Sequence, residues 1–102
     1  MQEEYMSDTD VIKPGKDVVA SMAEDFKKSL LDLVRNGIKE LVIDLSGVEI
    51  VDSVGLGVII AAHNSLSKSG GKLKIVNVSE DIYRLFQTMR LDQHFDVQPS
   101  GG

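Results

Sequence analysis

The sequence predicts a small α/β protein, built as a mainly parallel or mixed β-sheet with crossover α-helices packed against it. Short apolar runs, typical of strands, alternate along the chain with longer segments in which apolar residues recur every three or four positions, as on one face of a helix. This repeated strand–helix order requires crossover connections and hence parallel strands. A length of 102 residues corresponds to one domain, which buries roughly two-thirds of its unfolded surface in a single core.

The composition favours a cytoplasmic protein. The hydrophobic fraction of 42% and the charged fraction of 26% are ordinary for a globular chain. Because the sequence has no cysteine, it forms neither disulfides nor thiolate metal sites, and a reducing compartment suits it. No apolar run approaches the ~18–20 residues that span a bilayer, so we expect no membrane insertion.

The net charge of −5 comes almost wholly from the N-terminus, where the first ten residues contain four acids and no Lys or Arg. The rest of the chain has 12 acidic against 11 basic residues. No basic stripe is visible that could neutralise phosphates, which disfavours direct binding of nucleic acid. We expect a flexible acidic arm at 1–10, the folded domain at 11–97 and a flexible tail at 98–102.

The first predicted elements are a short strand and a long helix. The strand lies at 11–12 and is ended by Pro14-Gly15, a dipeptide typical of turns. Over 17–35 the apolar residues recur at helical spacing, which predicts a helix. Ser21 and Glu24 have the spacing of a capping box near its start.

The middle of the chain predicts a buried strand between two turns. Asn36-Gly37 ends the helix, because both residues tolerate the left-handed conformation. The strand at 41–45 is apolar on both faces except for Asp44, as in a parallel sheet. Ser46-Gly47 then turns the chain, and 48–51 forms a short extended segment.

Asp52 and Ser53 stand where this extended segment passes into the next helix, predicted at 54–69. Both are capping residue types, because their side-chain oxygens accept hydrogen bonds from the first N–H groups of a helix. If Asp52 caps the helix, Ser53 falls in the first turn and its hydroxyl faces outward, unused. Gly55 and Gly57 each cost a helix about 0.5–1 kcal/mol relative to Ala, which indicates that another backbone or a partner approaches closely there.

The last third of the chain predicts a strand, a helix and a second strand. Alternation over 72–78 is typical of a strand with one more polar side. Ser79 caps the helix that follows. The segment 94–97 is predicted as an edge strand. The core face of the helix consists of Ile82, Leu85, Phe86 and Met89.

The patterns of catalytic and cofactor-binding sites are absent. A nucleophile elbow needs glycine two residues to either side of its serine, whereas Val51 precedes Ser53 at that spacing. His63 lies roughly 15 Å along the same helix, too far to serve as a base, which leaves only His94 near the C-terminus. Because phosphate-loop, dinucleotide and metal-ligand patterns are also missing, we expect no enzyme activity, no cofactor and no metal.

Three segments together resemble a STAS domain of the bacterial anti-sigma factor antagonist type. They are Asp44-Leu45-Ser46-Gly47-Val48, then Asp52-Ser53-Val54-Gly55-Leu56-Gly57, and finally Gly70-Gly71-Lys72-Leu73-Lys74-Ile75-Val76-Asn77. The similarity extends from about Gly37 to Val97. It implies a STAS-type single domain, in agreement with the fold that the periodicity predicts.

The resemblance also implies roles for individual residues. In that family, an anti-sigma factor with serine kinase activity phosphorylates the serine that follows the aspartate, and a protein phosphatase removes the phosphate. Ser53 would therefore be phosphorylated. The partner-binding surface would include Asp52, Val54, Gly55, Leu56 and Gly57. It would also include Asp17, in the segment Gly15-Lys16-Asp17-Val18, where the acid stands one place from its usual position in the family.

The main hypothesis is a non-enzymatic partner-switching protein, which binds an anti-sigma factor and is released on phosphorylation of Ser53. The alternative is a STAS scaffold or regulatory subunit of another complex, chemoreceptor-like or lipid-transporting, in which Ser53 is only a structural helix cap. A small-molecule or nucleotide sensor would need a pocket that sequence does not reveal. A hydrolase using Ser53 would lack a base.

Overall fold

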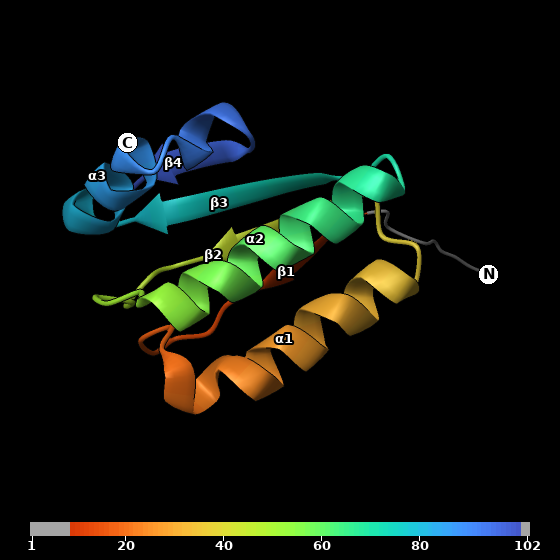
Figure 1. The fold of residues 1–102 in the computed structure, drawn as a ribbon, viewed down its shortest axis with the longest axis horizontal. Helices are drawn as coiled ribbons and strands as arrows, with labels where there is room; N and C mark the ends of the chain where they lie inside the picture. The colour runs from red at the N-terminus through yellow and green to blue at the C-terminus, as the bar shows by residue number, and fades with distance from the viewer. Residues whose placement is uncertain (1–8, 101–102) are drawn as a thin grey trace.

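A computed structural model describes residues 9–100 and shows four parallel strands in the order β1-β2-β3-β4 (Figure 1). This confirms the predicted α/β class with a parallel sheet. The strands are β1 (Thr9–Ile12), β2 (Glu40–Asp44), β3 (Lys72–Val78) and β4 (Asp96–Pro99). The connecting helices are α1 (Ala20–Arg35), α2 (Ser53–Lys68) and α3 (Glu80–Thr88), and a 3-10 turn, η2 (Leu91–Gln93), precedes β4.

Helices α1 and α2 lie side by side against one face of the sheet (Figure 1). Because each strand is added on the same side of the previous one, right-handed crossovers place their helices on a common face. The strands alternate accordingly: Leu41, Ile43 and Ile75 are buried against the helices, whereas Val42 is half-exposed on the other face. The core therefore lies between the sheet and its helices, and the carboxyl ends of the strands lead into the N-termini of those helices.

The start of α1 differs from the prediction. The helix begins at Ala20 rather than near position 17, its N-cap Val19 makes no side-chain cap, and the proposed capping box of Ser21 and Glu24 is wrong. Val18 is fully buried and forms a bridge with Val51, so the chain is still extended there. The first N–H of the helix, that of Ala20, instead donates a hydrogen bond to the side chain of Asp52, which is distant in the sequence.

The end of α1 and the start of α3 agree with the prediction. Asn36 is the C-cap of α1, and Gly37 adopts a φ of +85°, which favours glycine. Ser79 is the N-cap of α3 and accepts a hydrogen bond from the Ile82 N–H at 3.3 Å. Local capping signals therefore identified these two boundaries correctly.

Both terminal strands are placed differently from the prediction. β1 starts at Thr9, two residues before the expected boundary; positions 1–8 of the predicted arm lie outside the described residues. β4 spans 96–99 instead of 94–97, because Leu91 and Phe95 are buried and the compact turn between them delays the strand. Two positions of the predicted tail thus belong to the sheet, while 101–102 are not described.

Candidate functional site

The N-terminus of α2 presents Ser53 at the surface. Asp52 is the N-cap, and its Oδ1 accepts a hydrogen bond from the Gly55 N–H at 2.8 Å. Ser53 is the first residue of the helix and is exposed, and its hydroxyl makes no hydrogen bond to any residue within 9–100. Of the two adjacent capping residue types, Asp52 is the one that caps the helix, and Ser53 falls in the first turn, as expected for that case. The alternative role of Ser53 as the helix cap is wrong, because Asp52 already occupies that position.

The Asp52 carboxylate joins the N-termini of two helices. While Oδ1 binds the N–H of Gly55, Oδ2 accepts a hydrogen bond at 3.0 Å from the N–H of Ala20, the first residue of α1. The backbones are joined as well, since the N–H of Asp52 donates to the carbonyl of Val18 at 3.1 Å. These N–H groups, Gly55 first and then Ala20, lower the pKa of Asp52 below its usual value.

Asp17 holds the segment that precedes Ser53. Its Oδ1 accepts hydrogen bonds from the N–H groups of Glu49 at 3.0 Å and Ile50 at 3.1 Å. The structure therefore brings Asp17 to the same edge of the sheet as Ser53, although 32 positions separate Asp17 from its partner Glu49. These hydrogen bonds were not predicted from the sequence, because they join two loops that are far apart along the chain.

The two glycines of α2 have different surroundings. A Cβ on Gly55 would lie 2.1 Å from the carbonyl oxygen of Val18, so only glycine allows the loop before α1 to pass so closely. A Cβ on Gly57 would have no neighbour within 4 Å. Gly55 thus serves the packing of this chain, whereas Gly57 leaves an open stretch of helix backbone at the surface.

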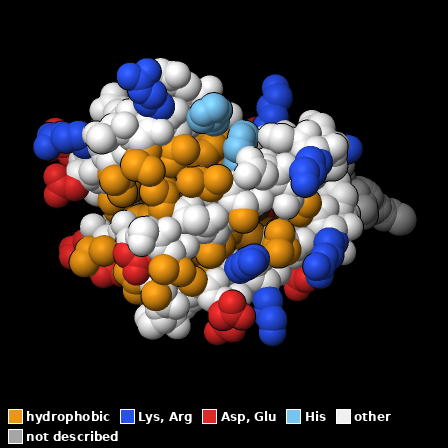
Figure 2. Space-filling view, in the orientation of Figure 1, with side chains coloured by type: hydrophobic (Ala, Val, Ile, Leu, Met, Phe, Trp, Pro, Cys, Tyr) orange, Lys and Arg blue, Asp and Glu red, His pale blue; other side chains and the backbone are white. Residues whose placement is uncertain are grey.

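The exposed residues around Ser53 form a partly apolar surface. Ile50 is 54% exposed and Val54 is 49% exposed, whereas Leu56 is only 6% exposed and packs in the core. We call Ile50, Ser53, Val54 and Gly57 the Ser53 surface. Figure 2 shows hydrophobic side chains beside acidic ones at the end of the molecule where α2 begins. Ile50 was not predicted, because nothing in the local pattern distinguishes it from its buried neighbours Val48 and Val51.

A second carboxylate fastens the same edge of the sheet. Asp44 Oδ1 accepts hydrogen bonds from Ser46 Oγ at 2.6 Å, the Ser46 N–H at 2.9 Å and Asn77 Nδ2 at 3.0 Å. These bonds, led by the one from the Ser46 hydroxyl, lower the pKa of Asp44. They explain the acid that follows the apolar residues Leu41, Val42 and Ile43 in β2: Asp44 ties the carboxyl ends of β2 and β3 together.

The pKa shifts predict acid sensitivity that depends on Asp52. Because folding lowers the pKa of this carboxyl, it stabilises the fold above the unfolded pKa of about 3.9, and this contribution is lost as the pH falls through the lower folded value. Asp52→Asn should therefore unfold at lower urea than the wild type at pH 7, and the difference should shrink between pH 5 and pH 3. Asparagine still caps a helix, but it replaces one of the two carboxylate oxygens with an NH2 group, which donates and cannot accept the hydrogen bond that this oxygen accepted.

The matched control for this prediction is Asp25→Asn, on the exposed face of α1. Urea midpoints measured from pH 7 to pH 3 should then coincide with those of the wild type. A difference between Asp52→Asn and wild type that stays constant over this range would contradict the assigned role of the carboxylate.

The two histidines lie together rather than at Ser53. The ring centroids of His63 and His94 are 6.2 Å apart, and both residues line a hollow that does not include Ser53. Within residues 9–100, no group of three or more His, Cys, Asp or Glu side chains could hold a metal ion. No helix in this part of the chain is long and apolar enough to cross a membrane.

The protein belongs to the STAS domain family, whose model matches residues 6–101. A Thermotoga maritima protein, whose name assigns it to the anti-sigma factor antagonists, is 33% identical over 86% of this chain and 79% of its own length. The anti-sigma-B factor antagonist of Bacillus subtilis is 37% identical over 70% of this chain and 64% of its own length. A crystal structure of a Thermotoga maritima antagonist superposes with a TM-score of 0.86 and 29% identity, covering 96% of this chain and 85% of the other.

Proposed function

We propose that this protein is an anti-sigma factor antagonist that is controlled by phosphorylation of Ser53. Family membership and the names of the relatives support the antagonist role. The observation that carries the assignment of the site is the exposed, unbonded hydroxyl of Ser53, beside a carboxylate that already caps the helix. The hydroxyl has no structural task and is open to a kinase.

The Ser53 surface provides the binding site for the anti-sigma factor. Ile50 and Val54 supply exposed apolar area, and Gly57 allows a partner to approach the helix backbone. Asp17 and Asp52 are half-exposed beside them and offer carboxylates at its border. Gly55 and Leu56 act from inside, because they set the position of the helix that carries the surface.

In this proposal the partner is also the kinase, and the STAS chain is its substrate. The Ser53 oxygen attacks the γ-phosphorus of ATP bound to the kinase, its proton passes to a base of the kinase, and ADP leaves. A protein phosphatase later hydrolyses the ester and restores the hydroxyl. This chain contributes no catalytic group to either reaction, which agrees with a non-enzymatic role.

Phosphorylation releases the partner by local repulsion. It adds about −1.5 to −2 charges at the N-terminus of α2, where the helix dipole tolerates negative charge. A partner carboxylate docked nearby has no such compensation: two unit charges ~6 Å apart at an effective dielectric of ~20 repel by roughly 3 kcal/mol. That corresponds to about a hundredfold loss of affinity, without rearrangement of the fold.

The test is phosphopeptide mass spectrometry on protein isolated from its own cells, grown with and without stress. We expect a gain of one phosphate on Ser53 that depends on the growth condition. Ser65 and Ser67 lie on the same tryptic peptide as Ser53, because no Lys or Arg stands between Lys39 and Lys68. Fragment ions therefore have to locate the phosphate, and these two serines serve as internal controls that should remain unmodified. An unmodified Ser53 under every condition, with a stable partner co-purifying, would favour a constitutive scaffold.

A further inference from the structure

The only two histidines of the chain are brought together by the fold, although 31 positions separate them. His63 lies on α2 and His94 directly follows η2; their ring centroids are 6.2 Å apart, with the ring planes at 50°. Figure 2 shows the two imidazoles side by side at the surface. Phe95 fixes this arrangement, because it is buried and its ring centroid lies 5.2 Å from that of His63 and 6.2 Å from that of Phe86.

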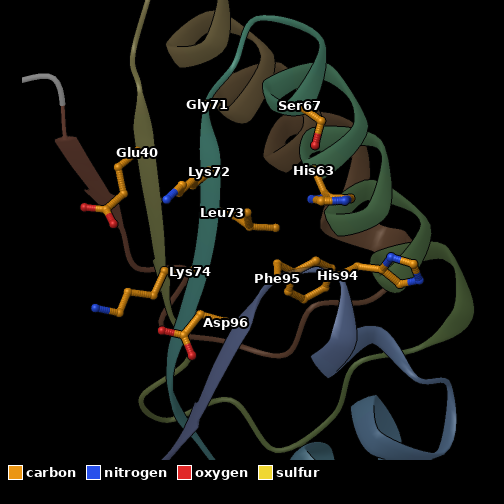
Figure 3. A pocket seen from close by; sticks show the side chains of 10 residues that line it. All are labelled: Glu40, His63, Ser67, Gly71, Lys72, Leu73, Lys74, His94, Phe95 and Asp96. Atoms are coloured by element: carbon orange, nitrogen blue, oxygen red, sulfur yellow. The ribbon is translucent and has the colours of Figure 1, made fainter.

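The imidazoles border a hollow at an unpaired part of the sheet. β4 pairs with β3 only from Lys74 onward, so the edge of β3 at Lys72 and Leu73 has no neighbouring strand on that side. A cavity of about 460 Å³ opens there, between α2, β3 and the start of β4. In Figure 3, His63 and His94 lie on the α2 side of β3, whereas the side chains of Lys72 and Lys74 point to the other side.

We propose that His63 and His94 together bind one divalent transition-metal ion, for which Zn²⁺ is the representative. Neutral imidazole is a good ligand for Zn²⁺, Ni²⁺ and Cu²⁺. With a metal–nitrogen distance of about 2.0–2.1 Å, an ion lies about 3.2 Å from each ring centroid. Two rings on one tetrahedral ion are then about 5.2 Å apart. The two rings lie 6.2 Å apart in this structure, so the exposed side chain of His94 has to move about 1 Å towards His63 to share one ion with it.

The site has two protein ligands. Among the described residues, no third His, Cys, Asp or Glu side chain joins them to form a three-ligand metal site. Water fills the remaining positions, so the site exchanges its metal readily, unlike a closed four-ligand structural site. The ion would join α2 to the segment before β4, two parts of the chain that otherwise meet through the packing of Phe95. Metal binding should therefore raise the thermal midpoint of unfolding.

Zinc titration of the whole, tag-free chain tests this site, since a polyhistidine tag would itself bind the metal. We expect saturable 1:1 binding of ZnCl₂ by isothermal titration calorimetry. His63→Gln and His94→Gln should each weaken it by at least about tenfold, since even the loss of a residue that only supports a ligand costs 10–100-fold. Ser67→Ala, in the same hollow but without an imidazole, should bind as the wild type does.

Proton NMR of the wild type provides a readout that needs no variant. Addition of Zn²⁺ should shift the imidazole signals of both histidines together, with one midpoint. The absence of saturable binding, or binding that survives both substitutions, would overturn the proposal. A stoichiometry of one ion to two chains would also overturn it, because the site is built within one chain.

Discussion

Ser53→Asp is expected to weaken binding of the anti-sigma factor by about a hundredfold, because one fixed negative charge beside a partner carboxylate costs roughly 3 kcal/mol. The fold should not suffer, since a carboxylate in the first turn of a helix stabilises it by about 0.3–1 kcal/mol. The partner can be captured from its own cells on Ser53→Ala protein, which cannot be phosphorylated, and identified by mass spectrometry. Dissociation constants are then measured with the purified pair.

Ser53→Ala is the control for that experiment, because it removes the hydroxyl without adding charge. It should bind as tightly as the unmodified protein and resist release when ATP is added. If Ser53→Asp binds as tightly as Ser53→Ala, charge at this position does not control the complex. The protein would then be a scaffold, and the exposed hydroxyl would have no regulatory role.

Gly55→Ala is expected to destabilise the fold by at least about 2 kcal/mol, since overpacking of this kind commonly costs 1–3 kcal/mol. The new Cβ would lie 2.1 Å from the Val18 carbonyl oxygen and 2.8 Å from Val18 Cγ1, so the backbone itself has to move. The gain of about 0.5–1 kcal/mol in helix propensity does not offset this. Thermal denaturation should show a midpoint lower by about 10 °C for a domain of this size.

Gly57→Ala is the matched control, two positions along the same helix. With nothing within 4 Å of its Cβ, it should stabilise the protein by about 0.5–1 kcal/mol. If Gly57 gives the anti-sigma factor access to the helix backbone, this more stable variant should also bind it more weakly. Equal effects of the two substitutions on the thermal midpoint would contradict the close approach of Val18 to α2.

The class of the fold was predicted correctly from sequence alone, and the cap of α2 was narrowed to two adjacent residues, Asp52 and Ser53. Hydrophobic periodicity and capping residues are local signals. Asn36-Gly37 and Ser79 mark helix boundaries because they interact with backbone groups within one turn of the helix. The same holds for Asp52, whose bond to the Gly55 N–H spans three residues. These features depend on hydrogen bonds between residues close together in the chain, so they can be predicted from the sequence.

Contacts between segments far apart in the sequence hold this edge of the domain together. The second oxygen of Asp52 binds Ala20 across 32 residues, which replaces the local cap that Ser21 and Glu24 suggested. The bracing of Ile50 by Asp17 depends on a loop contact of the same range.

The sequence also did not show which residues of the segment 52–57 are buried and which are exposed. Residues two positions apart on a helix point to nearly opposite sides, so Leu56 enters the core while Val54 remains exposed. The glycines differ for a related reason: Val18 passes against Gly55 and leaves Gly57 open. The pairing of His63 with His94 has the same origin, since it depends on where β4 joins the sheet. Contacts between distant segments decide these features, and their partners are not readable from residue spacing.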